Sequence, residues 1–460
     1  MMQYHDFLKA KEIRAESYGF EPQDSNPALF QYESDIVRWA LMKGRAAIFA
    51  DCGLGKTAMQ LQWAKEVSEH EKKPVLICAP LAVSTQTQKE GRKFGVSVTV
   101  CKTQADCSDG VNITNYERLH LFDAEQFAGV VLDESSILKD STSATRKALT
   151  EMFENTPFKL CCTATPSPND FMELGTHSEF LGVMKQPEML ATFFCHDGGN
   201  TSKWRLKGHA EVKFFEWVAS WACCVTNPAD LGYDGSDFIL PELRIEEHIV
   251  ETAEKMDADG QCMLFSATTQ TLNERRAARR DSLSDRVSEA ARIANSTDDQ
   301  VLVWCDLNAE SEALAQAIRG AVEVRGSNTP EYKENAMNGF TSGENRVLVS
   351  KPSIAGWGMN WQQCHEMIFV GLSDSFEAYY QAVRRCWRFG QKSPVTVHIV
   401  ISDAEGCVKD NVERKQADAQ RLTRELVRHT KEIMKAEIKK TTRISETYIT
   451  VERMEVPSWI

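Results

Sequence analysis

The chain has 460 residues, of which 42% are hydrophobic and 26% are charged, and its net charge is −13. A chain of this length is too long for one compact core, so we expect two domains with attachments. The acidic total excludes a surface covered in phosphate-binding side chains, although it allows a local positive cleft.

Targeting and cysteine patterns favour a soluble protein of the cytoplasm. The charged first residues lack the apolar core of a secretory signal, and no apolar run approaches the roughly 18 residues that a membrane helix needs. The fourteen cysteines contain no CxxC pair. This usage favours reduced thiols over a zinc site or a secreted disulfide scaffold. We therefore expect a cytoplasmic location, in a bacterial or phage-infected cell.

Short apolar runs alternate with amphipathic stretches from residue 46 onward. Five runs have the composition of buried strands, at 46–50, 75–79, 112–114, 129–133 and 159–165. Continuous apolar strands that alternate with helices are typical of a parallel sheet with both faces covered. The first part of the chain therefore predicts an α/β lobe over residues 1–170.

The alternation stops over residues 171–245, which are rich in Trp and Phe, and we expect a helical insertion there rather than a continuation of the sheet. A second α/β series predicts another lobe over residues 246–406. Its expected strands are 301–305, 321–325, 346–350, 367–371 and 396–402. Residues 407–460 are expected to form a C-terminal helical extension. Two such lobes in one chain predict a cleft between them that a ligand can bridge.

A strand, a glycine turn and a helix follow one another in AAIFADCGLGKT, residues 46–57. The backbone N–H groups of such a turn surround phosphate oxygens at the start of a helix. Lys56 is expected to reach the β- and γ-phosphates, and the Thr57 hydroxyl to bind Mg²⁺. The predicted ATP-binding segment is completed by the neighbouring residues Gly53, Leu54, Gly55 and Ala58.

An acidic pair ends the expected strand GVVLD, residues 129–133. Asp133 is expected to hold the Mg²⁺ shell, and Glu134 to position and deprotonate the attacking water. The alternative is an ordinary helix cap, for which the run DESS is also suited. The phosphate loop some 75 residues upstream favours the catalytic interpretation.

These two motifs, together with five more in the expected order, resemble superfamily-two helicases, and more closely the Swi/Snf-like ATPases of the DEAD/DEAH type and their phage-encoded subgroup. The resemblance covers residues 28–415. It rests also on APLAVSTQTQKE (79–90), ITNYERL (113–119), TATPSPND (163–170), KPSIAGWGMNW (351–361) and QAVRRCWRFGQ (381–391). The resemblance implies two RecA-like lobes and the cofactors ATP and Mg²⁺.

The resemblance also assigns roles to particular residues. Thr163 and Thr165, with Ser136, are expected to couple hydrolysis to lobe movement. Pro80, Thr114, Tyr116 and Asn360 are expected to contact nucleic acid, and Gly358 to lie near the nucleotide. Gln381, Arg385 and Arg388 share one helical face, and the arginines are expected to act as fingers that reach across the closed cleft. The alternative for this segment is a basic, solvent-facing helix, against which Trp387 and Phe389 argue.

Three positions depart from the family pattern. Ser136 stands where relatives commonly have histidine or aspartate, and this shorter hydroxyl is expected to alter the coupling between hydrolysis and movement. Relatives usually carry a glutamine that contacts adenine beside an aromatic residue, whereas here Tyr32 is followed by Glu33 and the nearby glutamine is Gln31. Both Glu33 and Gln31 remain candidates for the adenine contact. Arg384 stands where relatives usually have glycine, and the sequence predicts no effect for it.

Two basic segments are further candidates for DNA contact. The first contains Arg275, Arg276, Arg279 and Arg280, and the second is residues 411–443, with ten Lys or Arg against five Asp or Glu. A solvated face and a helix that braces the lobes are the respective alternatives. Trp204, Trp217 and Trp221 fit a core better than a base-stacking platform.

The sequence thus predicts an ATP-dependent motor stimulated by double-stranded DNA, which translocates along nucleic acid. The alternatives are a strand-separating DNA or RNA helicase and a nucleotide-gated binding switch. DNA is the expected partner, with a protein partner that supplies targeting or nuclease function.

Overall fold

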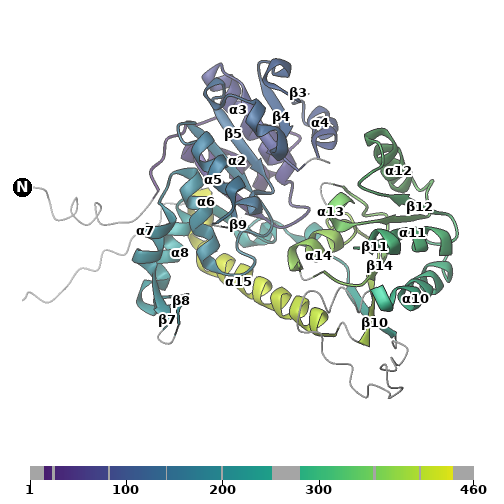
Figure 1. The fold of residues 1–460 in the computed structure, drawn as a ribbon. Coiled ribbons are helices and arrows are strands. Elements are labelled where there is room, and N and C mark those ends of the chain that lie inside the picture. Colours follow the sequence, from purple (N-terminus) through teal and green to yellow (C-terminus); the bar gives the residue numbers. More distant parts are fainter. Residues whose placement is uncertain are drawn as a thin grey trace, which may run out of the picture.

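The computed structural model describes residues 15–22, 26–80, 83–140, 142–197, 200–250, 280–355, 359–373, 375–403 and 406–438. These residues form two α/β lobes that lie side by side, each built on its own sheet (Figure 1). Within the described ranges, the helices are all too short or too polar to span a bilayer. The structure confirms the predicted α/β class with parallel sheets.

The first lobe is built on a seven-stranded parallel sheet in the order β3-β4-β2-β5-β6-β1-β9. Its strands are β1 (Arg45–Ala50), β2 (Val75–Ala79), β3 (Val98–Val100), β4 (Val111–Asn115), β5 (Gly129–Asp133), β6 (Phe158–Cys162) and β9 (Ala222–Val225). The five expected strands of this lobe are all present. The central strands are buried along their whole length, as the apolar runs predicted.

The expectation that residues 171–245 do not continue the sheet is wrong at β9. This strand pairs in parallel with β1, with Ala47 opposite Ala222 and Ala50 opposite Val225. It follows the helix that contains Trp217 after a two-residue turn at Ser220 and Trp221, and Ser220 is the one polar residue that marks this boundary in the apolar run from Trp217 to Val225. The open edge of β1, which is distant in sequence, therefore decides that the end of this run is a strand.

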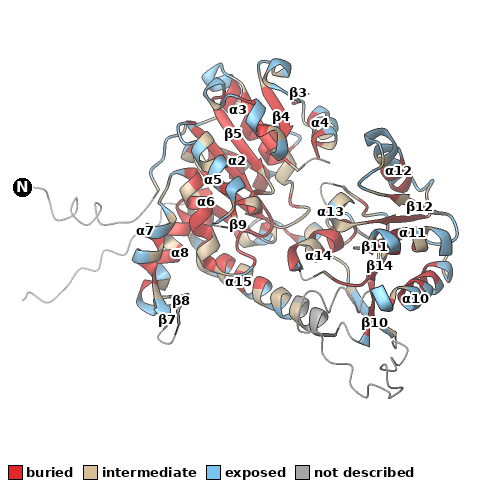
Figure 2. Ribbon diagram, viewed as in Figure 1, coloured by how far each residue is buried: buried red, intermediate tan, exposed pale blue. Residues whose placement is uncertain are grey.

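Helices cover both faces of the first sheet (Figure 2). The helices of this lobe are α2 (Gln31–Lys43), α3 (Lys56–Glu71), α4 (Ser84–Lys93), α5 (Ala144–Met152), α6 (Leu174–Leu181), α7 (Gln186–Phe193) and α8 (Glu211–Ala219). One core lies between the sheet and α2 and α3, and the other lies between the sheet and α5 to α8. Trp217 and Trp221 are buried in the second core, as expected, and Trp204 is half-buried against it.

Shorter elements complete the lobe. An antiparallel hairpin joins β7 (Phe194–Asp197) to β8 (Asn200–Leu206). The 3₁₀ turns are η1 (Gln104–Asp106), η2 (Tyr116–Leu121), η3 (Ala124–Gln126), η4 (Ser135–Leu138), η5 (Phe171–Glu173), η6 (Gly208–Ala210), η7 (Pro228–Leu231) and η8 (Ser236–Phe238).

The second lobe is built on a six-stranded parallel sheet in the order β10-β15-β14-β11-β13-β12. Its strands are β10 (Leu243–Val250), β11 (Val301–Cys305), β12 (Ala321–Val324), β13 (Val347–Ser350), β14 (Glu366–Val370) and β15 (Val395–Ser402). Its helices are α10 (Leu283–Asn295), α11 (Asn308–Ala317), α12 (Pro330–Ser342), α13 (Pro352–Ala355) and α14 (Phe376–Val383). The edge strand β10 was not predicted, because its sequence LRIEEHIV is charged and mostly exposed.

The predicted C-terminal helix is α15 (Gly406–Ile438), which runs from the second lobe back along the first (Figure 1). Leu422 and Leu426 join the core beside α8, and Met434 and Ile438 join the core on the other face of the sheet. The apolar side of α15 thus fastens it to the first lobe, in agreement with a bracing role.

Candidate functional site

The phosphate loop lies between β1 and α3, as the sequence predicted. Gly53 and Gly55 have φ values of 88° and 69°, a region that favours glycine because it has no Cβ. Lys56 Nζ donates to the carbonyl oxygens of Ala50 at 2.9 Å and Asp51 at 3.2 Å, so its ammonium group lies over the loop. The backbone N–H groups at the start of α3 and the Lys56 charge therefore face the same place, as phosphate binding requires.

The acidic pair lies at the end of β5, the neighbour of β2 and β6 in the sheet. Asp133 Oδ1 accepts a hydrogen bond of 2.7 Å from Gln60 on α3, which ties the carboxylate to the helix that begins at the loop. Glu134 has a φ of 55°, a strained value for a residue with a side chain. Strain of this kind at the end of a central strand indicates that the position of the side chain has a function.

The carboxyl group of Glu134 is tuned toward neutral pH. Its pKa is raised to about 7, chiefly by burial; the charge of Lys56 opposes this shift and the charge of Asp133 adds to it. Burial also raises the pKa of Asp133. A base with a pKa near the working pH is suited to accept a proton from an attacking water.

The segment predicted to couple hydrolysis to movement touches this carboxylate. The Thr163 hydroxyl donates to Glu134 Oε2 at 3.3 Å and accepts from the Thr165 backbone N–H at 3.1 Å. The Thr165 hydroxyl is buried and has no hydrogen-bond partner among the described residues. Ser136 is buried in η4. The contact with Glu134 supports the predicted coupling role of Thr163, which remains a prediction.

The structure brings Glu33 to the phosphate loop and leaves Gln31 outside it. A Cβ on Gly55 would lie 1.7 Å from Glu33 Oε1, so the two residues are in direct contact. Glu33 Oε2 accepts from the Phe30 backbone N–H at 2.9 Å, and burial raises the pKa of Glu33 to about 7. Gln31 is exposed and donates to Asp35 at 3.1 Å. Of the two candidates for the adenine contact, the geometry favours Glu33.

Aromatic rings from three parts of the chain meet beside Glu33. Phe238, in the connection between the lobes, stacks on Phe389 of the second lobe with ring centroids 4.5 Å apart. Tyr32 meets the edge of the Phe238 ring at 5.5 Å, and Phe30 lies 5.7 Å from it. The sequence analysis identified Tyr32 but not Phe238, because nothing in its local sequence connects η8 to the start of α2. This cluster offers flat apolar surfaces of the kind on which a base stacks.

Gln381, Arg385 and Arg388 lie together in the second lobe. Arg385 donates to the Gln381 side chain at 2.9 Å and to the Met359 carbonyl at 3.0 Å, and Arg388 donates to the same carbonyl at 3.3 Å. Both arginines are therefore held within their own lobe in this structure. Burial lowers the pKa of Arg385, an effect that the nearby carboxylate of Glu134 opposes. Their action as fingers across the cleft remains a prediction.

Arg384, to which the sequence assigned no role, bonds directly across the cleft to the phosphate loop. Its side chain is 3% exposed, lies 3.0 Å from Asp51 of the phosphate loop and donates to the Cys52 carbonyl at 2.7 Å. The Tyr380 hydroxyl donates to the same Asp51 at 2.5 Å. The departure from glycine at position 384 thus provides an ionic contact between the second lobe and the phosphate loop.

The predicted nucleic-acid contacts have different outcomes in the structure. The prediction for Thr114 is wrong, because this side chain is 1% exposed and its hydroxyl donates to the Cys101 carbonyl inside the sheet. The Tyr116 hydroxyl donates to the Asp133 carbonyl at 2.6 Å, so it supports the acidic pair. Pro80 and Asn360 are half-buried and available for contact. Gly358 and the arginines at 275, 276 and 279 lie outside the described residues.

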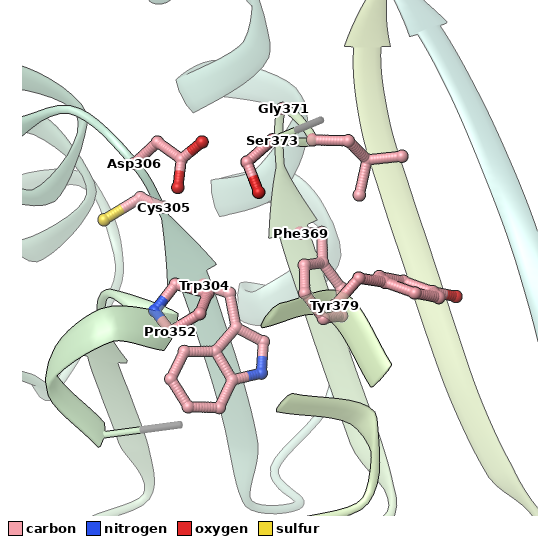
Figure 3. A pocket seen from close by; sticks show the side chains of 9 residues that line it. Trp304, Cys305, Asp306, Pro352, Phe369, Gly371, Ser373 and Tyr379 are labelled. Carbon is pink, nitrogen blue, oxygen red and sulfur yellow. The ribbon is translucent and has the colours of Figure 1, made fainter. Parts of the chain in front are cut away.

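A small hollow at the carboxyl ends of β11 and β14 contains no residue of the phosphate loop, the acidic pair or the arginine segment 384–388 (Figure 3). Trp304, Phe369 and Tyr379 form its apolar wall, and the oxygens of Asp306 and Ser373 lie at its other end (Figure 3). The ATP chemistry must therefore be sought at the phosphate loop, not here.

Comparisons with known proteins agree with the geometry. Residues 32–193 match the family described as SNF2-related domain, and residues 285–390 match the helicase conserved C-terminal domain. The chain is similar to the mouse (Mus musculus) DNA annealing helicase and endonuclease ZRANB3, at 21% identity over 449 residues and 85% of this chain. It covers 40% of the length of that relative.

Among solved structures, the chain is similar to the SWI2/SNF2 ATPase core of Sulfolobus solfataricus in complex with dsDNA. The identity is 16% and the TM-score is 0.42, with 92% of this chain and 97% of that chain covered.

Proposed function

Because the chain is an Snf2-like helicase of superfamily two that carries both lobes of such an ATPase, we propose that it uses ATP hydrolysis to translocate along double-stranded DNA. One observation carries the proposal. The half-buried base Glu134, the phosphate loop and the arginine segment 384–388 meet at the junction of the two lobes. A nucleotide bound at this junction contacts both lobes and can change how they dock.

Each residue then has a defined task in hydrolysis. Lys56 and the N–H groups of the loop bind the phosphates, and Glu134 accepts the proton of the attacking water. The Thr57 hydroxyl and the Asp133 carboxylate are oxygen donors of the type that Mg²⁺ prefers, and a bound Mg²⁺ would offset the phosphate charge. Arg385 and Arg388 stabilise the charge of the transition state when the lobes close, an effect worth about 10³–10⁵ in rate.

Duplex DNA is the proposed track. The SNF2-related domain match and the relative described as a DNA annealing helicase support DNA over RNA. On the described part of α15, three arginines and one glutamate line one hollow: Arg421, Arg424, Arg428 and Glu425, the last of which pairs with Arg421. We propose Pro80 and Asn360 as backbone contacts, since phosphate contacts position a strand without reading its sequence.

Steady-state ATP hydrolysis with no nucleic acid, single-stranded DNA, duplex DNA and RNA tests this function. We expect the largest stimulation with duplex DNA, and we expect Glu134→Gln to abolish it. Glu151→Gln removes an exposed carboxylate of α5, outside all the motifs, and serves as the matched control, with unchanged activity.

Three outcomes contradict the proposal. Stimulation by single strands but not by duplex would favour the strand-separating alternative, and a strand-displacement assay would then be positive. No stimulation by any nucleic acid would favour a nucleotide-gated switch. Full activity of Glu134→Gln would remove the assigned base.

The finer proposals concern setting and partners. We propose that the chain belongs to the phage-type subgroup and acts in the cytoplasm of a bacterial or infected cell, together with a protein that supplies targeting or nuclease function. The twelve cysteines whose side chains the structure describes are all free thiols, which supports a reducing compartment. Fractionation of the host cell and affinity capture with the full chain test these points.

A further inference from the structure

A cluster of histidine and glutamate side chains lies at the β10 edge of the second sheet, on the face that α10 covers. Glu246 is directly opposite His398 in the pairing of β10 with β15, and His248 follows two residues later on the same face of β10. One donor atom of each of these three side chains lies within 4.8 Å of the other two. None of the three belongs to the ATP motifs or to the arginine segment.

Two further carboxylates fix the orientation of the imidazole rings. His248 Nδ1 lies 3.2 Å from Glu289 Oε1 of α10, and His398 Nε2 lies 3.1 Å from Glu366 Oε2 of β14. An ionised carboxylate only accepts hydrogen bonds, so these outer nitrogens are the ones that carry a proton. The inner nitrogens of the neutral rings then present lone pairs. A carboxylate behind each histidine is the arrangement that orients histidine ligands at metal centres.

The three lone-pair donors converge on one point. His248 Nε2 faces His398 Nδ1 at 3.1 Å, and Glu246 Oε2 lies 3.4 Å from the same Nδ1. Acceptors at these distances repel one another unless a cation lies between them. Tetrahedral nitrogen and oxygen ligands of Zn²⁺ are separated by about 3.3 Å, given bonds of about 2.0–2.1 Å. The spacing in this cluster is therefore already close to that of a zinc site.

We propose that Glu246, His248 and His398 bind a divalent transition-metal ion, Zn²⁺ in the first place, with water as the fourth ligand. Two imidazoles and a single carboxylate suit zinc, whereas Mg²⁺ and Ca²⁺ require oxygen ligands throughout. The side chains are 54%, 21% and 11% exposed, in the order named, so an ion has access to the site. The ion would link β10 to its neighbour β15. β10 is the edge strand with which the chain enters the second lobe.

Cobalt is the probe for this site, because tetrahedral Co²⁺ absorbs visible light whereas Zn²⁺ does not. The full chain, stripped with a chelator, is titrated with Co²⁺ and then with Zn²⁺. We expect one Co²⁺ per chain with the absorption of a tetrahedral site, and its loss when Zn²⁺ is added. Glu246→Ala and His248→Ala should abolish this absorption. Glu289→Ala, which frees the outer nitrogen of His248, should weaken binding about 10–100-fold.

The matched control is His120→Ala, which removes an exposed histidine of the first lobe and should leave Co²⁺ binding unchanged. A wild-type chain without stoichiometric Co²⁺ binding would overturn the proposal and leave a shared proton between the rings. Binding that persists in both Glu246→Ala and His248→Ala would also overturn it and assign the ion to cysteine thiols. Circular dichroism verifies that each variant is folded. If His248→Ala does not fold, the result for Glu246→Ala decides the test, because Glu246 is the most exposed of the three ligands.

Discussion

Replacement of Arg384 by methionine tests whether one side chain of the second lobe holds the phosphate loop of the first. Arg384 is almost fully buried, lies 3.0 Å from Asp51 and donates to the Cys52 carbonyl at 2.7 Å. Methionine retains most of the apolar stem and removes the charge and the donors. We therefore expect the lobes to separate more readily in Arg384→Met.

The size of the effect follows from burial. Loss of one partner of a buried, hydrogen-bonded charge pair at an interface costs about 2–5 kcal/mol. The Asp51 side chain is 26% exposed and keeps its bond of 2.5 Å from Tyr380, so water and this hydroxyl compensate part of the loss. We expect about 2–3 kcal/mol, which is about a 30- to 140-fold shift from docked to separated lobes.

Small-angle X-ray scattering of the nucleotide-free chain measures this shift. We expect a larger radius of gyration for Arg384→Met than for the wild type. The control Arg319→Met removes an arginine of the second lobe that is 68% exposed and pairs with Asp298 at the surface. Such a surface pair contributes about 0–1 kcal/mol, so we expect no change in scattering.

A double-mutant cycle with Asp51→Asn separates the pair from other effects of the substitutions. If the two residues act together, the double variant should be no more open than Arg384→Met alone. An unchanged radius of gyration in Arg384→Met, or additive effects of the two substitutions, would refute the reasoning.

Three further predictions concern buried groups. Glu33 has a pKa of about 7 in the folded chain against an ordinary value of 4.5, so its burial lowers the free energy of unfolding as the pH rises from about 4.5 to 7. Urea denaturation should therefore show that Glu33→Gln is more stable than the wild type by about 3 kcal/mol at pH 8 and equally stable at pH 4.5. An equal difference at both pH values would contradict the assignment. Arg286 and Glu310 form a fully buried ion pair of 2.8 Å, and Arg286→Met would leave the charge of Glu310 buried without this partner. In the same assay this substitution should lower the free energy of unfolding by about 3–5 kcal/mol. A loss below about 1 kcal/mol would be inconsistent with this reasoning. Gly55→Ala places a Cβ 1.7 Å from Glu33 Oε1 at a φ of 69°, which strains the phosphate loop by about 1–3 kcal/mol. Titration with a fluorescent ATP analogue should therefore show binding weakened about tenfold. Gly95→Ala, with a similar φ but open space around it, should bind the analogue as the wild type does.

The sequence by itself determined the two parallel sheets and the ATP motifs. Runs such as residues 75–79 and 301–305 are apolar throughout, and the structure has strands with these same bounds. The phosphate loop and the Asp133–Glu134 pair were also predictable, because each depends on a short segment and the strand just before it. Local chemistry is sufficient where one segment provides the whole feature.

Only the tertiary structure decided the features that join distant segments. β9 became a strand because β1 offered it an open edge, and Thr114 became a core residue because β4 lies inside the sheet. The choice of Glu33 over Gln31 depended on its contact with Gly55, and the role of Arg384 depended on Asp51 in the other lobe. The physical reason is common to all of them: burial, edge pairing and ion pairing depend on which surfaces meet, and the local sequence does not record its partners.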